Sequence, residues 1–257
     1  MHDTQTSRPF ACVDIVLALG LLTRLPMRVG DKDFATRSAF AVWAYPLVGA
    51  VVGVLAAMIA TTVYRLGVPA GIAAALALAT MALITGAMHE DGLADSADGL
   101  GGGRDAKSSL SIMRESQIGA YGSVALTISL LARWSALLVL VQIQHLFWPL
   151  VVAATVSRLP MVLALYGLPP ARAAGLASSV GRPKRSAVLG AIALAFAIAF
   201  FASGPGGFWI IFWAVVAPLP LFVLAQSKIG GHTGDILGAS QQLAEIAALS
   251  VLVAQFV

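Results

Sequence analysis

The chain has 257 residues, of which 59% are hydrophobic and only 11% are charged. This composition excludes an ordinary soluble domain and is typical of a polytopic membrane protein. The single cysteine, Cys12, excludes an internal disulfide and offers a metal ion no second thiolate. The net charge of +4 does not indicate a nucleic-acid partner, because the basic residues are spread over the predicted loops instead of forming one patch.

The apolar segments predict an all-α fold, a helical bundle of about seven membrane spans preceded by a short helix. Residues 10–22 are too short to span and are followed by Arg24-Leu25-Pro26, so we expect an interfacial or re-entrant helix there. No small-residue cleavage site follows, which argues against a signal peptide. With no repeat and no long linker, residues 1–257 are expected to form one membrane-embedded domain. The spans are expected at 38–64, 68–89, 119–141, 146–167, 187–203, 207–226 and 241–257.

The Lys and Arg residues predict the orientation of these spans. With seven spans, residues 1–37 and the loops 90–118, 168–186 and 227–240 share one side of the membrane. That side holds 13 of the 16 Lys and Arg residues, and the opposite side holds only Arg65. The positive-inside rule makes the basic side cytoplasmic. We therefore expect a multi-pass protein of the cell (inner) membrane with its chemistry at the cytoplasmic face.

The strongest candidate for a site is the acidic stretch after the second predicted span. Glu90, Asp91, Asp95 and Asp98 fall within nine residues. On a helix the three aspartates project from one face, and charges that close stay ionised only with a cationic partner. Oxygen ligands alone favour Mg²⁺ or Mn²⁺ over zinc. A solvated acidic turn is the alternative, but a chain with only 12 acidic residues does not need four together for solubility. His89 adjoins the stretch and fits a cap of the preceding span equally well.

A glycine-rich cytoplasmic loop carrying basic residues follows the acidic stretch. Its glycines, at 101–103, allow close approach to an anionic ligand, although a merely flexible loop has the same composition. Arg104 and Arg114 can bind phosphate oxygens. Loop 90–118 is therefore one expected active-site loop, and loop 227–240, which carries further polar residues, is the other.

The acidic stretch is one polar island in this apolar chain, and residues 230–239 form a second. The second island comes just before the last predicted span and contains Thr233 and Asp235. Because both islands share the predicted cytoplasmic face, we expect Asp235 within about 10 Å of Asp95 or Asp98, close enough for two shells of groups around a metal. The alternative is that Asp235 caps the last helix.

Two arginines and one glutamate fall inside predicted spans, where a charge is costly. Arg133 and Arg158 can pair with Glu245 or with the acidic stretch, or contact a substrate phosphate.

Taken in order, these segments resemble the cobalamin-5′-phosphate synthase family, the adenosylcobinamide-GDP ribazoletransferases. The resemblance runs nearly end to end, and its long motifs are highly specific because they occur in order at suitable distances. The motifs are Leu22-Thr23-Arg24-Leu25-Pro26, Tyr45-Pro46-Leu47-Val48-Gly49, His89-x-Asp91-Gly92-Leu93-Ala94-Asp95-x-x-Asp98-Gly99, Ile112-Met113-Arg114-x-Ser116-x-Ile118-Gly119-x-Tyr121-Gly122, Ser157-Arg158, Ala171-Arg172-x-x-Gly175-Leu176 and Gly230-Gly231-x-Thr233-Gly234-Asp235-x-x-Gly238-Ala239.

The resemblance implies a Mg²⁺-dependent transferase of vitamin B12 (cobalamin) biosynthesis that completes nucleotide loop assembly. In this reaction α-ribazole, or its 5′-phosphate, attacks the cobinamide-linked phosphate of adenosylcobinamide-GDP, and GMP leaves. The expected partners are these two substrates and the lipid bilayer, with no nucleic acid. An oligomer and contacts with other enzymes of the pathway are compatible with this function.

The implied site residues fall into three groups. Metal ligands are expected at Asp91, Asp95, Asp98 and Glu90. Catalytic roles are expected for Asp91, Asp95, Asp98 and Asp235, one of the cluster aspartates being a candidate to accept the hydroxyl proton. Substrate or phosphate contacts are expected at Arg24, Arg104, Arg114, Arg158 and Thr233.

Two other functions compete with this one. A CDP-alcohol type of membrane phosphotransferase also uses Asp-x-x-Asp-Gly, which Asp95-Ser96-Ala97-Asp98-Gly99 matches, but the Ala-Arg pair expected next is replaced by Gly102-Gly103. A cation-coupled transporter would carry acids at mid-span and inverted repeats. The acids here cluster in predicted loops, so the transferase is the preferred function.

Overall fold

The computed structural model describes residues 10–28 and 30–256. All regular structure in these residues is helical, and no strand forms among them, which confirms the predicted all-α class. The helices are α1 (Cys12–Leu22), α2 (Asp31–Ala41), η1 (Val42–Ala44), α3 (Tyr45–Arg65), α4 (Ala70–Thr85), α5 (Met88–Gly102), α6 (Ala106–Ile112), α7 (Ala120–Gln142), α8 (Phe147–Val156), α9 (Leu159–Gly167), α10 (Leu176–Val180), α11 (Arg185–Ser203), η2 (Gly204–Gly206), α12 (Gly207–Val216), α13 (Leu219–Ile229) and α14 (Gly234–Phe256).

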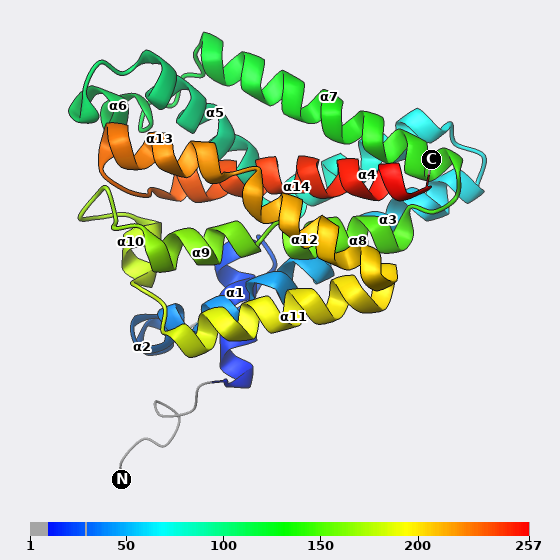
Figure 1. Ribbon diagram of the computed structural model, residues 1–257, viewed down its shortest axis with the longest axis horizontal. Coiled ribbons are helices and arrows are strands. Elements are labelled where there is room, and N and C mark those ends of the chain that lie inside the picture. Colours follow the sequence, from blue (N-terminus) through cyan, green and yellow to red (C-terminus); the bar gives the residue numbers. More distant parts are fainter. Residues whose placement is uncertain (1–9, 29, 257) are drawn as a thin grey trace.

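Five helical segments of the described residues are long and apolar enough to cross a membrane, or six if the bent pair α4–α5 is one span. The predicted count of seven is not confirmed. It differs partly because Arg185–Ile229 counts as a single segment of 45 residues. In Figure 1 this segment reverses direction at η2, so that α12 returns along α11. The protein is a helical membrane protein, and its exact number of spans stays a prediction. The end of the last predicted span, Val257, lies outside the described residues.

Small residues allow the central helices to pack closely. Gly49 and Gly53, one turn apart on α3, lie against α8, where a Cβ at Gly53 would come within 2.9 Å of the Val151 Cα. A Cβ at Gly49 would collide with the carbonyl oxygen of Ala154. Lipid chains are as apolar as the helices themselves, so close backbone approach of this kind drives helix association in membranes. The main core accordingly centres on α3 and α8, with α4 packed against α3 and with α11 and α14 packed against α8.

The N-terminal helix α1 has 11 residues and is too short to cross a bilayer. It is tied to the next segments by a buried ion pair, in which Arg37 Nε donates to Asp14 Oδ1 at 2.7 Å. Trp43 Nε1 donates to the other carboxylate oxygen at 3.0 Å. Whether α1 lies at the membrane interface stays a prediction.

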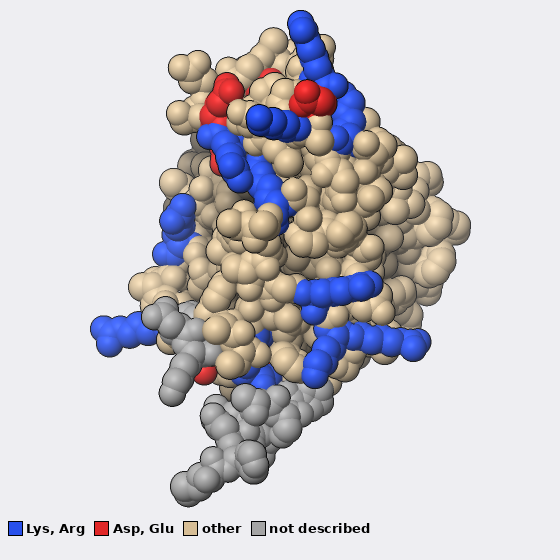
Figure 2. All heavy atoms as spheres, turned by 90° about the vertical axis from the view of Figure 1, so that its left-hand side faces the viewer, with Lys and Arg blue, Asp and Glu red and all other residues tan. Residues whose placement is uncertain are grey.

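The predicted loops gather at two opposite ends of the bundle. Figure 1 shows α6, α10 and the junction of α13 and α14 at one end, with the short turns before α4, before α8 and at η2 at the other. Figure 2 looks onto the first end and shows Lys, Arg, Asp and Glu side chains across it. We call it the charged end. Because the two polar islands are both there, any site that they form lies at the charged end.

Candidate active site

The chain turns sharply between α4 and α5, and this turn carries the acidic stretch out of the apolar bundle. Gly86 ends α4 with φ 68°, and Ala87 follows with φ 56°. Left-handed backbone of this kind ends helices, and glycine adopts it without strain. The two helix axes differ by 87°. Arg24 lies over this corner, because its backbone N–H donates to the Ile84 carbonyl at 2.6 Å and its side chain covers Gly86.

Two glycines bring the polar islands into direct contact. A Cβ on Gly92 of α5 would lie 2.8 Å from the Asp235 carbonyl oxygen and 3.2 Å from the Gly238 Cα. A Cβ on Gly238 of α14 would lie 3.0 Å from the Met88 carbonyl oxygen. The helices therefore touch backbone to backbone, and Asp95 lies within electrostatic range of Asp91 and Asp235.

Thr233 and Arg172 hold the carboxylate of Asp235. Thr233 Oγ1 donates to Asp235 Oδ2 at 3.1 Å and accepts the Ile236 N–H at 3.2 Å. Thr233 thus supplies the capping oxygen at the start of α14. Arg172 Nη1 lies 3.5 Å from Asp235 Oδ2. The Asp235 carboxylate is engaged by side chains, so the alternative of Asp235 as the helix cap lacks support.

Arg172 reaches the site because its loop is bonded to the second polar island. The Ala171 N–H donates to the His232 carbonyl and the His232 N–H donates to the Pro169 carbonyl, both at 2.9 Å. A Cβ on Gly231 would collide with the Pro169 carbonyl oxygen, so glycine is needed at that position. Partial burial lowers the pKa of Arg172, and Asp235 acts in the opposite direction. The guanidinium stays charged in either case.

A pocket of about 320 Å³ opens between these elements at the charged end. Its polar lining comes from four separate parts of the chain, and the residues are Arg24, Asp91, Arg172, Thr233 and Asp235, with Ser178 and His232 at its side. Two guanidinium groups and two carboxylates around one space suit a phosphorylated ligand together with a divalent cation.

The fit to a metal ion depends on three carboxylates. Asp91, Asp95 and Asp235 offer the oxygen donors that Mg²⁺ prefers. Arg172 pairs with Asp235 and lies within electrostatic range of Asp95. No three His, Cys, Asp or Glu residues in the described part of the chain are close enough to enclose a metal. Mg²⁺ is commonly held by one or two carboxylates, with water and substrate phosphate completing its shell. The residues present fit that open kind of site.

The structure places two other predicted ligands elsewhere. Both oxygens of Asp98 accept backbone N–H groups at the start of α7, from Gly119 at 2.7 Å and Gly122 at 2.9 Å. A Cβ on Gly119 or on Gly122 would collide with the Asp98 carboxylate, which explains both glycines of that motif. Glu90 is turned into the bundle, where its Oε1 accepts from Arg133 at 3.2 Å.

Glu90 and Arg133 belong to a buried network with Glu245 and Arg158. Glu245 Oε1 lies 3.2 Å from Arg133 and its Oε2 lies 3.5 Å from Arg158. The predicted pairing of the intramembrane arginines with Glu245 is confirmed. Two positive and two negative side chains balance one another, as buried charges require. Arg158 is therefore engaged in this network and does not line the pocket, contrary to its expected phosphate contact.

The remaining predicted phosphate ligands, Arg104 and Arg114, are exposed residues flanking α6. Arg114 lies within electrostatic range of Arg172, so it is near the pocket. Arg172 has no predicted role, although its place in the motif Ala171-Arg172-x-x-Gly175-Leu176 marks it as a candidate.

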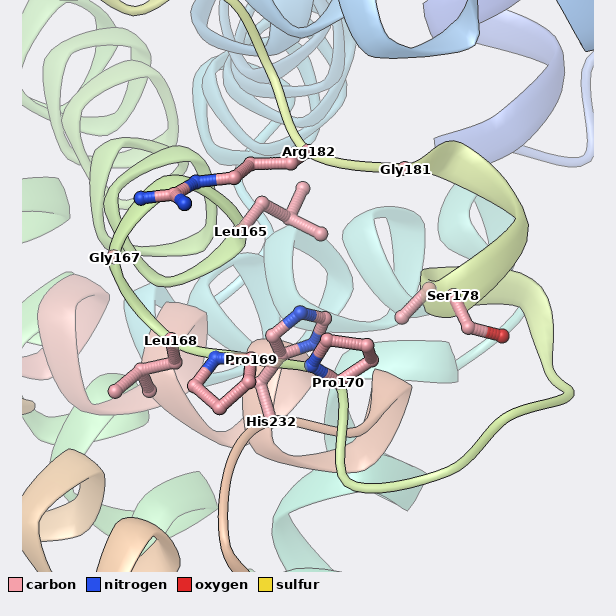
Figure 3. A pocket seen from close by; sticks show the side chains of 10 residues that line it. Leu165, Gly167, Leu168, Pro169, Pro170, Ser178, Gly181, Arg182 and His232 are labelled. Atoms are coloured by element: carbon pink, nitrogen blue, oxygen red, sulfur yellow. The ribbon is translucent and has the colours of Figure 1, made fainter.

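A second pocket, of about 300 Å³, adjoins the first across the 169–170 loop. Figure 3 shows the His232 imidazole beside Pro169 and Pro170, with Leu165 and Arg182 across the space. Burial lowers the pKa of His232. Arg182 is held by a hydrogen bond to the Tyr166 carbonyl at 2.8 Å, so this pocket offers few free polar groups.

The protein is a polytopic helical bundle with carboxylates and arginines around a pocket at its charged end. This arrangement is typical of the class of membrane-embedded proteins that bind phosphorylated ligands. Comparison with known proteins specifies the family. The chain belongs to the family described as cobalamin-5-phosphate synthase, whose model matches residues 14–253. The predicted resemblance is confirmed.

Similar proteins carry the name adenosylcobinamide-GDP ribazoletransferase. The one from Mesorhizobium japonicum is 41% identical over 93% of this chain and 92% of its own. Those from Bradyrhizobium diazoefficiens and Xanthobacter autotrophicus are 43% and 45% identical, over 94% and 91% of this chain and 93% and 92% of their own. No solved structure matches the chain.

Proposed function

We propose that the pocket between Arg24, Asp91, Arg172 and Asp235 is the active site of a membrane-bound adenosylcobinamide-GDP ribazoletransferase. The enzyme joins adenosylcobinamide-GDP to α-ribazole or its 5′-phosphate, giving adenosylcobalamin or its 5′-phosphate and GMP. Family membership and the names of the relatives support the activity. The convergence of four chain segments on one charged pocket supports the location.

The reaction exchanges a phosphoanhydride bond for a phosphate ester bond. A ribose hydroxyl oxygen of the acceptor forms a bond to the cobinamide-linked phosphorus, and the bond from that phosphorus to the oxygen of GMP breaks. Negative charge increases on the leaving phosphate and must be neutralised in the pocket. Arg24 and Arg172 are placed to bind phosphate oxygens, with Arg114 at the rim. A carboxylate of the pocket, Asp91 or Asp235, accepts the hydroxyl proton.

Mg²⁺ is the proposed cofactor, and one or two of the carboxylates of Asp91, Asp95 and Asp235 would hold it. When bound, it would neutralise phosphate charge and favour ionisation of a hydroxyl group. Arg172 pairs with Asp235, and this contact helps to fix the direction of that carboxylate in the pocket. The contact of Gly92 with Gly238 keeps the α5 and α14 carboxylates together.

The enzyme is proposed to lie in the cell inner membrane with this pocket facing the cytoplasm. Thirteen of the 16 Lys and Arg residues fall in the segments predicted for that side. Figure 2 shows basic side chains across the charged end, which contains the pocket. A cytoplasmic pocket has direct access to the nucleotide-linked substrate and releases GMP where it can be reused.

The test is GMP release by the purified protein in lipid nanodiscs. GMP should appear from adenosylcobinamide-GDP only when α-ribazole or its 5′-phosphate is present, and EDTA should stop it until Mg²⁺ is restored. GMP release without an acceptor would indicate a hydrolase. No release with either acceptor would reject the proposed function.

A further inference from the structure

A small apolar pocket next to the proposed active site contains a buried histidine without a partner. This pocket has a volume of about 60 Å³. His89 is 2% exposed, and neither of its ring nitrogens has a hydrogen-bond partner among the described residues. Buried polar groups are normally paired, so an unpaired imidazole in a pocket wall is available to bind a partner that enters the pocket.

The pocket adjoins the proposed active site and is lined by residues of the family motifs. The two pockets share Met88, Leu176, Ala177 and Gly234 as lining residues. Five of the motifs quoted above contribute to the small pocket, through Leu22, Tyr45, His89, Leu176, Gly234 and Gly238. Segments far apart in the sequence thus meet around His89, two residues before Asp91. The neighbouring pocket at His232 draws on a position that the motif leaves open.

We infer that this pocket binds the benzimidazole base of α-ribazole, with a His89 ring N–H donating to the base nitrogen that carries no ribose. This rests on the proposed function and names the subsite of one of its two substrates. The base is a flat fused ring with one free acceptor nitrogen and otherwise carbon edges. Imidazole carries at least one N–H in each of its protonation states, so the hydrogen bond does not depend on titration.

Size and polarity select this base over other parts of the substrates. About 10–15 Å³ of such volume accommodates one water of about 30 Å³, so the pocket holds about four to six waters, the size of a fused two-ring base. A corrin ring is far larger. Guanine presents several polar atoms on its edges, which the apolar wall formed by Leu22, Met161 and Leu237 would leave unpaired. With the base in this pocket, its ribose emerges between Arg24, Asp91 and Asp235.

The test compares two histidines that line neighbouring pockets. His89→Phe keeps an aromatic ring but removes the donor, and His89→Gln restores one. His232→Phe makes the matched change in the adjoining pocket. We expect His89→Phe to raise the KM for α-ribazole about tenfold or more, the effect of one lost hydrogen bond to a buried group. The KM for adenosylcobinamide-GDP should stay within about twofold, and His89→Gln should recover part of the loss.

An indole riboside, which lacks the acceptor nitrogen, separates recognition from folding. Wild type should use it as poorly as His89→Phe uses α-ribazole, and His89→Phe should not distinguish the two. An unchanged KM for α-ribazole in His89→Phe, or the larger increase in His232→Phe, would overturn the assignment. Binding of α-ribazole measured by equilibrium dialysis tests the subsite separately from turnover. Tight binding that His89→Phe weakens, without any GMP release, would reject the proposed function alone.

Discussion

The buried ion network is the feature whose removal should be most damaging. Glu245 accepts a hydrogen bond from Gln241 Nε2 at 2.6 Å and forms ion pairs with Arg133 at 3.2 Å and Arg158 at 3.5 Å. Glu245→Ala would leave one of the two buried guanidinium charges uncompensated. Breaking one partner of a buried pair costs about 3–5 kcal/mol. At about 2–4 °C per kcal/mol for a chain of this size, the thermal midpoint should fall by about 6–20 °C.

Thermal unfolding of the detergent-solubilised protein, followed by loss of the monodisperse peak in size-exclusion chromatography, measures this change. Glu115→Ala removes an exposed carboxylate and should shift the midpoint by less than about 2 °C. Combining Glu245→Met with Arg158→Met removes one charge of each sign, so most of the stability should return. An unchanged midpoint in Glu245→Ala, or a double variant whose midpoint falls by as much as the two single losses together, would show that charge balance does not stabilise this network.

Three further outcomes follow from the site. Asp91→Asn should lower the rate of GMP release about 100-fold, the loss typical of one electrostatic group, while the thermal midpoint stays within about 2 °C. Near-normal turnover would remove Asp91 from the site. Gly92→Ala places a methyl group 2.8 Å from the Asp235 carbonyl oxygen and should cost about 1–3 kcal/mol with loss of activity. Gly102→Ala, whose methyl would lie 3.6 Å from Ile112 Cδ1, is the silent control, and equal effects would contradict the backbone contact. In a Cys12→Ser background, cysteine at position 104 should react with an impermeant label only from the cytoplasm and cysteine at 145 only from outside. Labelling of both from one side would reject the topology.

The fold class could be predicted from hydropathy because spans are long apolar segments, but the chain direction between spans could not. The predicted span 68–89 runs through Gly86 and Ala87, where the structure turns by 87°. Gly86 was a visible stop signal, since glycine commonly follows a helix end. Ala87 carries no such signal, because its left-handed backbone depends on the packing of α5 against α14.

The carboxylates show the same division between local pattern and tertiary contact. Helical spacing correctly places Asp91 and Asp95 on neighbouring turns, but it also groups Asp98 with them. Asp98 faces the start of α7, and only the approach of Gly119 and Gly122 decides that. Glu90 is separated from the cluster by Arg133, which lies on a different helix. Residue type and spacing therefore identify the candidates, whereas their partners decide which of them line the pocket.

If the two polar islands form one active site, Asp235→Asn should slow GMP release. Thr233 remains to cap α14 in this variant, so folding should be retained and the thermal midpoint unchanged. We expect a loss of at least about 100-fold, because the charge that faces Arg172 and Asp91 is removed. Full activity of Asp235→Asn with both substrates would contradict it.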